Sequence, residues 1–179
     1  MRRLFIALFA VLATVCVAQE QDAWVPQGID TLRQSSSSHT GFSLDHSMLV
    51  LAAKLDPDNE DLQRVIAGVS GVSVRNYRFQ GAAAYDPESL KSVNDEYRTA
   101  GWKRVLDRHG KADAPEIKDV WVRMENKAIA NVAVMVARPT EVTFVSVAGS
   151  ISPEDVVKLG GHFGIPKIEG GVEVPSSPR

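Results

Sequence analysis

Three alternating apolar segments joined by two short turns constrain the fold of this chain more than any other feature. Residues 117–125, 130–136 and 142–148 place apolar side chains at every second position, which is the period of a β-strand with one buried face. The connections at Asn126-Lys127 and at Pro139-Thr140 are too short for the crossover that parallel neighbours need. The sequence therefore predicts a C-terminal three-stranded antiparallel meander.

Three other segments begin with the same helix-start pattern, which is a capping Asp or Ser followed by Pro and an acid. The capping oxygen accepts a hydrogen bond from a free backbone amide. Proline loses nothing at the first helical position, because its missing N–H would have no partner there, and the acid interacts favourably with the helix dipole. The pattern predicts helices that begin at Pro57, Pro87 and Pro153.

Apolar spacing completes the predicted architecture. It extends the second of these helices to His109 and places a short further helix over residues 47–54. Residues 72–80 alternate with a change of parity near Arg75 and Asn76, which predicts a β-bulge. We therefore expect a two-layer α+β domain, an antiparallel sheet of about four to five strands with about three to four helices packed on one face.

Residues 1–18 have the pattern of a signal peptide. Two arginines precede an apolar run, and cleavage after Ala18 leaves small residues at the two recognition positions. The run is short for a membrane span. A bacterial lipoprotein is cut before a cysteine that follows a small residue, and Val15 before Cys16 disfavours a lipid anchor. We expect an exported protein, periplasmic or secreted, with no transmembrane span in the mature chain.

Cleavage would leave 161 residues (179 − 18) without any cysteine. A domain of this size has to be stable through its core alone, since it cannot form disulfides. The net charge would fall from −2 to −4, because two arginines leave with the signal peptide. A mildly acidic chain without a basic block is a poor candidate for binding nucleic acid or anionic membranes.

Composition divides the rest of the chain into three parts. Residues 19–39 are polar and include four consecutive serines, which predicts a flexible tether. Residues 166–179 are rich in proline, glycine and serine, which predicts a disordered tail. Residues 40–165 carry the periodic patterns and are expected to form a single α+β domain.

The segments DHSMLVLAAKL, GVSVRNYRF and VSVAGSISPEDVVKLGGHFG follow one another in an order that resembles a bacterial exported family. The family is catalogued as a domain of unknown function, number 4252, and the resemblance covers about residues 44–165. Its most specific part is a strand ending in Ala148-Gly149, followed by Ser152-Pro153-Glu154. The resemblance implies export or a lipid anchor and a link with sigma and anti-sigma factors, hence envelope sensing. The family has no established activity, so the resemblance implies no catalytic residues.

Few residues suggest chemistry. His46 beside Asp45, and His162 in the sequence GGHFG, are weak acid/base candidates, and both are better explained as locally bonded or solvated histidines. The chain has no HxxxH, HExxH or CxxC spacing and no phosphate-binding glycine pattern. Its acidic pairs lie at predicted helix starts, where the dipole explains them. We therefore expect no catalytic residue, no cofactor and no metal.

One predicted surface invites a binding hypothesis. Trp121, Arg123, Asn131 and Met135 share the parity of the meander opposite to its valines. If the helices cover the valine face, these four side chains lie on an open sheet face, and an aromatic residue beside an arginine is typical of interfaces. The alternative is that Trp121 only covers its neighbours or packs beneath the tether.

These observations favour a non-enzymatic exported domain for interaction or sensing, with an unidentified envelope protein as partner and contact through the open sheet face. Two alternatives remain. The first is an enzyme that acts on envelope material with His46 and His162 as acid and base. The second is an envelope component anchored by lipid at Cys16.

Overall fold

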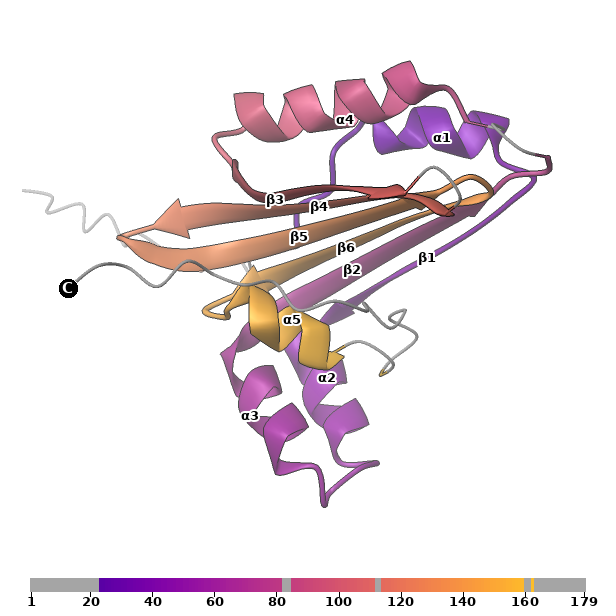
Figure 1. Cartoon of the computed structure of the whole chain (residues 1–179). Coiled ribbons are helices and arrows are strands. Elements are labelled where there is room, and N and C mark those ends of the chain that lie inside the picture. Colours follow the sequence, from indigo (N-terminus) through magenta and orange to yellow (C-terminus); the bar gives the residue numbers. More distant parts are fainter. Residues whose placement is uncertain (1–22, 82–84, 112–113, 160–161, 163–179) are drawn as a thin grey trace, which may run out of the picture.

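The computed structural model describes residues 23–81, 85–111, 114–159 and 162, which form an antiparallel sheet with helices on both of its faces (Figure 1). The predicted signal peptide and the predicted tail lie outside the described residues. The helices are α1 (Ile29–Ser35), α2 (His46–Ala53), α3 (Glu60–Gly68), α4 (Pro87–Thr99) and α5 (Pro153–Leu159). The strands are β1 (Ser38–Asp45), β2 (Val69–Arg78), β3 (Lys103–Lys111), β4 (Ala114–Glu125), β5 (Ala128–Arg138) and β6 (Glu141–Gly149).

The sheet has six strands in the order β1-β2-β6-β5-β4-β3, and every neighbouring pair is antiparallel. The predicted α+β class and the C-terminal meander β4-β5-β6 are confirmed. Asn126 and Lys127 have φ of 50° and 67°, the left-handed conformation that a two-residue hairpin turn requires. The strand number exceeds the prediction because the segment after α4 is a strand.

Helices cover both faces of the sheet, so the prediction that they pack on one face is wrong. In Figure 1, α1 and α4 lie above the sheet, whereas α2, α3 and α5 lie below one end of it. Each face has its own apolar core. The lower core includes Val122, Val134 and Val147, and the upper core includes Trp121 and Phe144. The helices and strands of the described residues therefore make three layers instead of the predicted two.

The two cores also explain the change of parity in β2, where the prediction of a bulge near Arg75 and Asn76 is wrong. The register with β6 is regular through these two residues and shifts only between Val69 and Gly71. Val74 belongs to the lower core, whereas Tyr77 belongs to the upper core. A regular strand that is covered on different faces at its two ends has the sequence pattern that we attributed to an inserted residue.

The helix predicted from Pro87 to His109 ends at Thr99, and residues 103–111 form β3. The stop is a Schellman motif, in which Gly101 N donates to the Arg98 carbonyl and Trp102 N donates to the Tyr97 carbonyl. Gly101 has φ of 80°, the left-handed conformation that this motif places after the helix. The apolar spacing continued past Gly101 only because β3 also carries apolar residues.

The helix-start pattern is confirmed twice and displaced once. Asp86 caps α4 by accepting from Glu88 N at 3.0 Å. Ser152 begins α5 with a capping box, because its Oγ accepts from Asp155 N while Asp155 Oδ2 accepts from Ser152 N. The helix predicted to begin at Pro57 is α3, and it begins at Glu60 instead. Asn59 caps it by accepting from Leu62 N at 3.1 Å, so Asn59 takes the role predicted for Asp56.

The prediction of a flexible tether over residues 19–39 is wrong for the described part of that segment, which contains α1 and the beginning of β1. Three sets of contacts hold this part of the segment against the sheet and α4. Ile29 and Leu32 are buried in the upper core. The Glu96 carboxylate on α4 accepts from Gln27 N and Gly28 N at 2.8 and 2.7 Å. The Trp24 carbonyl accepts from Ser146 Oγ at 2.7 Å. A few apolar residues in a polar segment are therefore enough to order it.

Among the described residues, none of the helices is both long enough and apolar enough to cross a membrane.

Candidate functional site

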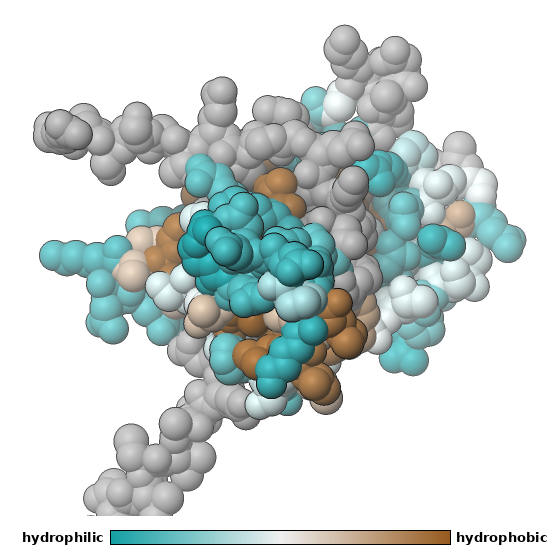
Figure 2. Space-filling model, turned by 90° about the horizontal axis from the view of Figure 1, so that it is seen from below, coloured by the Kyte–Doolittle hydropathy of each residue, from teal (hydrophilic) through white to brown (hydrophobic). Residues whose placement is uncertain are grey.

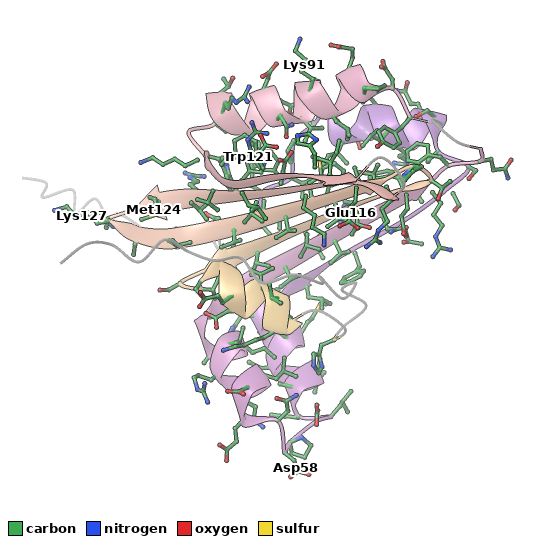
Figure 3. The ribbon with its side chains drawn as sticks, in the orientation of Figure 1. Asp58, Lys91, Glu116, Trp121, Met124 and Lys127 are labelled. Carbon is green, nitrogen blue, oxygen red and sulfur yellow. The ribbon has the colours of Figure 1, made fainter. Side chains whose placement is uncertain are left out.

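The sheet face predicted to be open is covered. Trp121 and Met135 are each 1% exposed, because residues of α1 and α4 and the Trp24 ring pack with them in the upper core, and Asn131 is buried as well. Figure 3 shows Trp121 between the sheet and α4. Only Arg123, at the end of β4, keeps an exposed side chain, and it pairs with Glu125 at 3.3 Å. The four residues share one parity as predicted, but their face is a core and cannot be a docking surface.

The two histidines considered as acid and base each follow a helix boundary and make local contacts. His46 opens α2, and its Nδ1 lies 2.7 Å from the Val69 carbonyl oxygen, a contact that ties α2 to β2. His162 follows α5, where its backbone N–H donates to the Leu159 carbonyl. His46 lines a groove between α2 and α3, and His162 is not among the residues lining that groove. Within the described residues, no three His, Cys, Asp or Glu side chains are grouped so that they could hold a metal ion.

The surface most suited to binding lies on α2, which has no charged residue in its sequence HSMLVLAA. Leu49 and Ala53 on this helix face the lower core. On another side of the helix, Met48 and Leu51 are 52% and 66% exposed, and their spacing of three residues places them on one face. Leu55 lies in the turn after the helix and is 85% exposed. We call these three residues the α2 stripe. A group of exposed large apolar side chains is a candidate interaction surface.

A groove lies between α2 and α3, on a different side of α2 from Met48 and Leu51, which do not line it. Its volume is about 450 Å³, within the range of pockets that bind ligands or inserted side chains. The floor is apolar, with Val50 and Ala53 from α2 and Ile66 from α3, while Lys54 and Gln63 lie at its margins. The two helices are held apart at this point by the turn through Pro57, whose carbonyl accepts from Gln63 Nε2 at 2.8 Å.

The turn between α2 and α3 carries a dense negative charge, which we call the acidic tip. It comprises Asp56, Asp58, Glu60 and Asp61. Arg64 compensates Asp61 at 2.8 Å, so most of the charge is unbalanced. Figure 3 places Asp58 at the end of the hairpin furthest from the sheet. Figure 2 views the molecule from this side and shows hydrophobic side chains next to a compact hydrophilic group.

Sequence reasoning placed α2 correctly but missed the stripe. The sequence did contain a signal for it. The apolar residues of α2 are not confined to one side of the helix, whereas a helix packed on one sheet face is apolar on only one side. The sequence predicted only a short helix over residues 47–54 packed on the sheet, since a short apolar run does not reveal which residues face solvent. The acidic tip was explained by the helix dipole alone, and its position beside the stripe depends on the tertiary structure.

The comparisons with known proteins give one result. A family model described as "Domain of unknown function (DUF4252)" matches residues 35–159, which is more than half of the chain. No curated protein matches the chain. No solved structure matches it either.

Proposed function

This chain belongs to the DUF4252 family, and we propose that it is a protein-interaction domain that docks an amphipathic helix with a basic flank onto the α2–α3 hairpin. The observation that carries the proposal is the α2 stripe, in which two large apolar side chains on α2 and a third in the turn after it are exposed, on a hairpin that also holds a groove. Helix-in-groove docking uses apolar anchors at the same three- and four-residue spacing.

The acidic tip selects the kind of partner. Its four carboxylates lie at one end of the stripe, and only Arg64 balances them within the tip. A partner helix with lysine or arginine next to its apolar anchors gains favourable electrostatics, whereas an acidic helix is repelled. The same charge disfavours an anionic lipid surface. In this respect the surface is complementary to a basic protein segment.

The test uses photo-crosslinking from Leu51 in cells that produce the chain, followed by affinity measurements with the crosslinked partner. Leu51→Glu is expected to weaken binding by at least about tenfold, because it buries an unpaired charge at the centre of the contact. The free energy of unfolding is expected to change by less than about 0.5 kcal/mol, since Leu51 is mostly exposed.

A matched pair of substitutions separates the docking surface from general surface effects. Met48→Glu and Met124→Glu make the same chemical change at exposures of 52% and 42%. Met124 lies on β4 near the β4–β5 turn and not on the hairpin (Figure 3). Loss of binding with Met48→Glu and retention with Met124→Glu supports the proposal. Equal binding by the Leu51→Glu and unchanged chains would overturn it, and a crosslink between two copies of the chain would identify self-association instead.

We also propose that the chain is exported and cut after Ala18, which supports a partner in the bacterial envelope. The signal pattern of residues 1–18 is the basis for this proposal. The intact mass of the protein in the periplasmic fraction is expected to match residues 19–179. A mass that includes diacylglyceryl on Cys16 would favour the lipid-anchored alternative, and a full-length chain confined to the cytoplasm would contradict export.

A further inference from the structure

We propose that a cavity between α4 and the β3–β4 edge of the sheet binds a small molecule through its primary ammonium group. This goes beyond partner docking and uses the opposite face of the sheet, since α4 lies above the sheet and the hairpin below it (Figure 1).

The cavity has a volume of about 280 Å³, at the lower end of the range for pockets that hold small molecules. Three elements supply its polar lining. Asn94 comes from α4, Arg104 and His109 come from β3, and Asp119 comes from β4. Leu90 and Met135 are among the apolar residues that complete the wall. The mixture of an apolar wall with a few convergent polar groups is typical of ligand sites.

Two acceptor atoms in this lining have no partner among the described residues. Asp119 is 1% exposed, and its Oδ1 accepts from Arg104 Nη1 at 3.3 Å while its Oδ2 accepts no hydrogen bond. The side-chain oxygen Oδ1 of Asn94 is buried and equally unpartnered. Proteins rarely leave such atoms unsatisfied, because each unmade hydrogen bond is unfavourable. A bound group that donates to both oxygens would remove this cost.

The positive charge nearest to Asp119 is shared between two carboxylates. The single Arg104 guanidinium serves two carboxylates, because it also contacts Asp107 at 2.9 Å. His109 contacts Asp107 at 3.0 Å and adds a positive charge only when it is protonated. Burial raises the pKa of Asp119 and the charge of Asp107 adds to that rise, while the charge of Arg104 and the polar side chains of Asn94 and Arg104 beside the carboxylate lower it.

A primary ammonium group fits these acceptors. It is compact, carries a full positive charge and has three N–H donors, so one group can reach both Asp119 and Asn94. Lys91 and Arg98 on α4 also line the cavity, and they pair with Glu88 at 3.6 Å and with Asp95 at 3.0 Å. Their positive charges suit a ligand with an acidic group at its other end. The ligand class is therefore a small primary amine, with amino acids as the members that also carry a carboxylate.

The experiment is an NMR titration of the full mature chain with three probes that isolate the two charges. Propylammonium carries only the cation, propionate carries only the anion, and β-alanine carries both. The reporter is the indole N–H of Trp121, since the Trp121 ring lies 5.4 Å from the Arg104 guanidinium carbon. Propylammonium and β-alanine are expected to shift this signal, whereas propionate is not.

Two variants test the assigned contacts. Asp119→Asn keeps the shape of the side chain and is expected to weaken the binding of propylammonium by at least about tenfold, because the charge is lost. Asp58→Asn makes the same change at the acidic tip and is expected to leave the affinity unchanged. If Asp119→Asn does not fold, Asn94→Ala replaces it, with the same tenfold criterion.

Three results would overturn the proposal. They are equal shifts with propionate and propylammonium, no shift with either ammonium probe up to its solubility limit, and unchanged affinity in the Asp119 or Asn94 variant that folds. Each result would mean that the cavity holds only water or that the ligand is recognised by other groups.

Discussion

Replacing Trp121 with alanine is expected to lower the free energy of unfolding by about 3 to 5 kcal/mol, the usual cost of removing a fully buried large aromatic side chain. Trp121 is 1% exposed. Its ring stacks on Tyr97 with the centroids 5.3 Å apart, and the Arg104 guanidinium carbon lies 5.4 Å from its ring centroid. The substitution removes the contact through which β4 supports α4. Equilibrium unfolding in urea measures the change.

Two further substitutions, one at Arg123 and one at Trp121 itself, separate the loss of the buried ring from other effects. Arg123→Ala lies two residues further along the same strand and face, where the side chain is 44% exposed, and it is expected to cost less than about 1 kcal/mol. Trp121→Phe is expected to cost much less than Trp121→Ala, because the indole N–H has no partner among the described residues. Similar unfolding curves for the Trp121→Ala and Arg123→Ala chains would mean that the upper face of the sheet is open, as the sequence alone suggested.

Replacing Gly149 with alanine is expected to destabilise the chain by at least about 3 kcal/mol, because backbone strain and a steric clash coincide. Gly149 has φ of 137°, a conformation that side chains rarely adopt. An added Cβ would collide with the Gly68 carbonyl oxygen and lie 2.8 Å from Val69 Cα. The first is a backbone atom at the end of α3 and the second belongs to the β2–β6 pairing, so neither can move aside without disturbing that junction. Thermal and urea unfolding measure the effect.

Gly101→Ala is the matched control for this prediction, since Gly101 also has a positive φ, of 80°. An added Cβ at Gly101 would meet no atom within 4 Å. This substitution is therefore expected to cost only the conformational preference, about 1 kcal/mol. The difference between the two glycine variants measures the clash alone. If both cost the same, the close approach of β6 to the end of α3 does not carry the effect.

Gly149 also explains the segment on which the family resemblance was most specific. The strand that ends in Ala148-Gly149 lies beside the first residues of β2, where Val69 pairs with Gly149 and the register shifts before Gly71. Ser152 then begins α5 within the same few residues. This segment joins a strand to a helix at a point where two backbones nearly touch. Its residues are accounted for by packing, and the proposed binding sites lie elsewhere.

Much of the fold could be predicted because it depends on neighbours in sequence. The two hairpin turns of the meander, the Asp86 and Ser152 caps and the short helix α2 all result from contacts within a few residues. Alternation fixes which residues of a strand share a face, so Trp121, Asn131 and Met135 were correctly placed together. Local patterns of this kind are unchanged by the rest of the chain.

The candidate sites were harder to predict, because each one requires segments that lie far apart in sequence. Asp119 and Asn94 line one cavity only after α4 packs on the sheet. The α2 stripe is exposed because α2 packs into the lower core through other residues, Leu49 and Ala53. The helix predicted to continue to His109 was wrong for a similar reason. The residues after Gly101, which form β3, have a pattern that is compatible with either a helix or a strand.

The sequence by itself determined the strands of the meander, two of the three helix starts and the grouping of residues on each strand face, since turns, caps and alternation depend on backbone sterics and hydrogen bonds over a few residues. Only the tertiary structure decided which face is covered. That outcome depends on contacts such as the one from Ser146 to the Trp24 carbonyl, which are 122 residues apart. A segment that is polar on average became ordered because a few of its side chains fill the upper core, and the surface left exposed was the apolar side of α2.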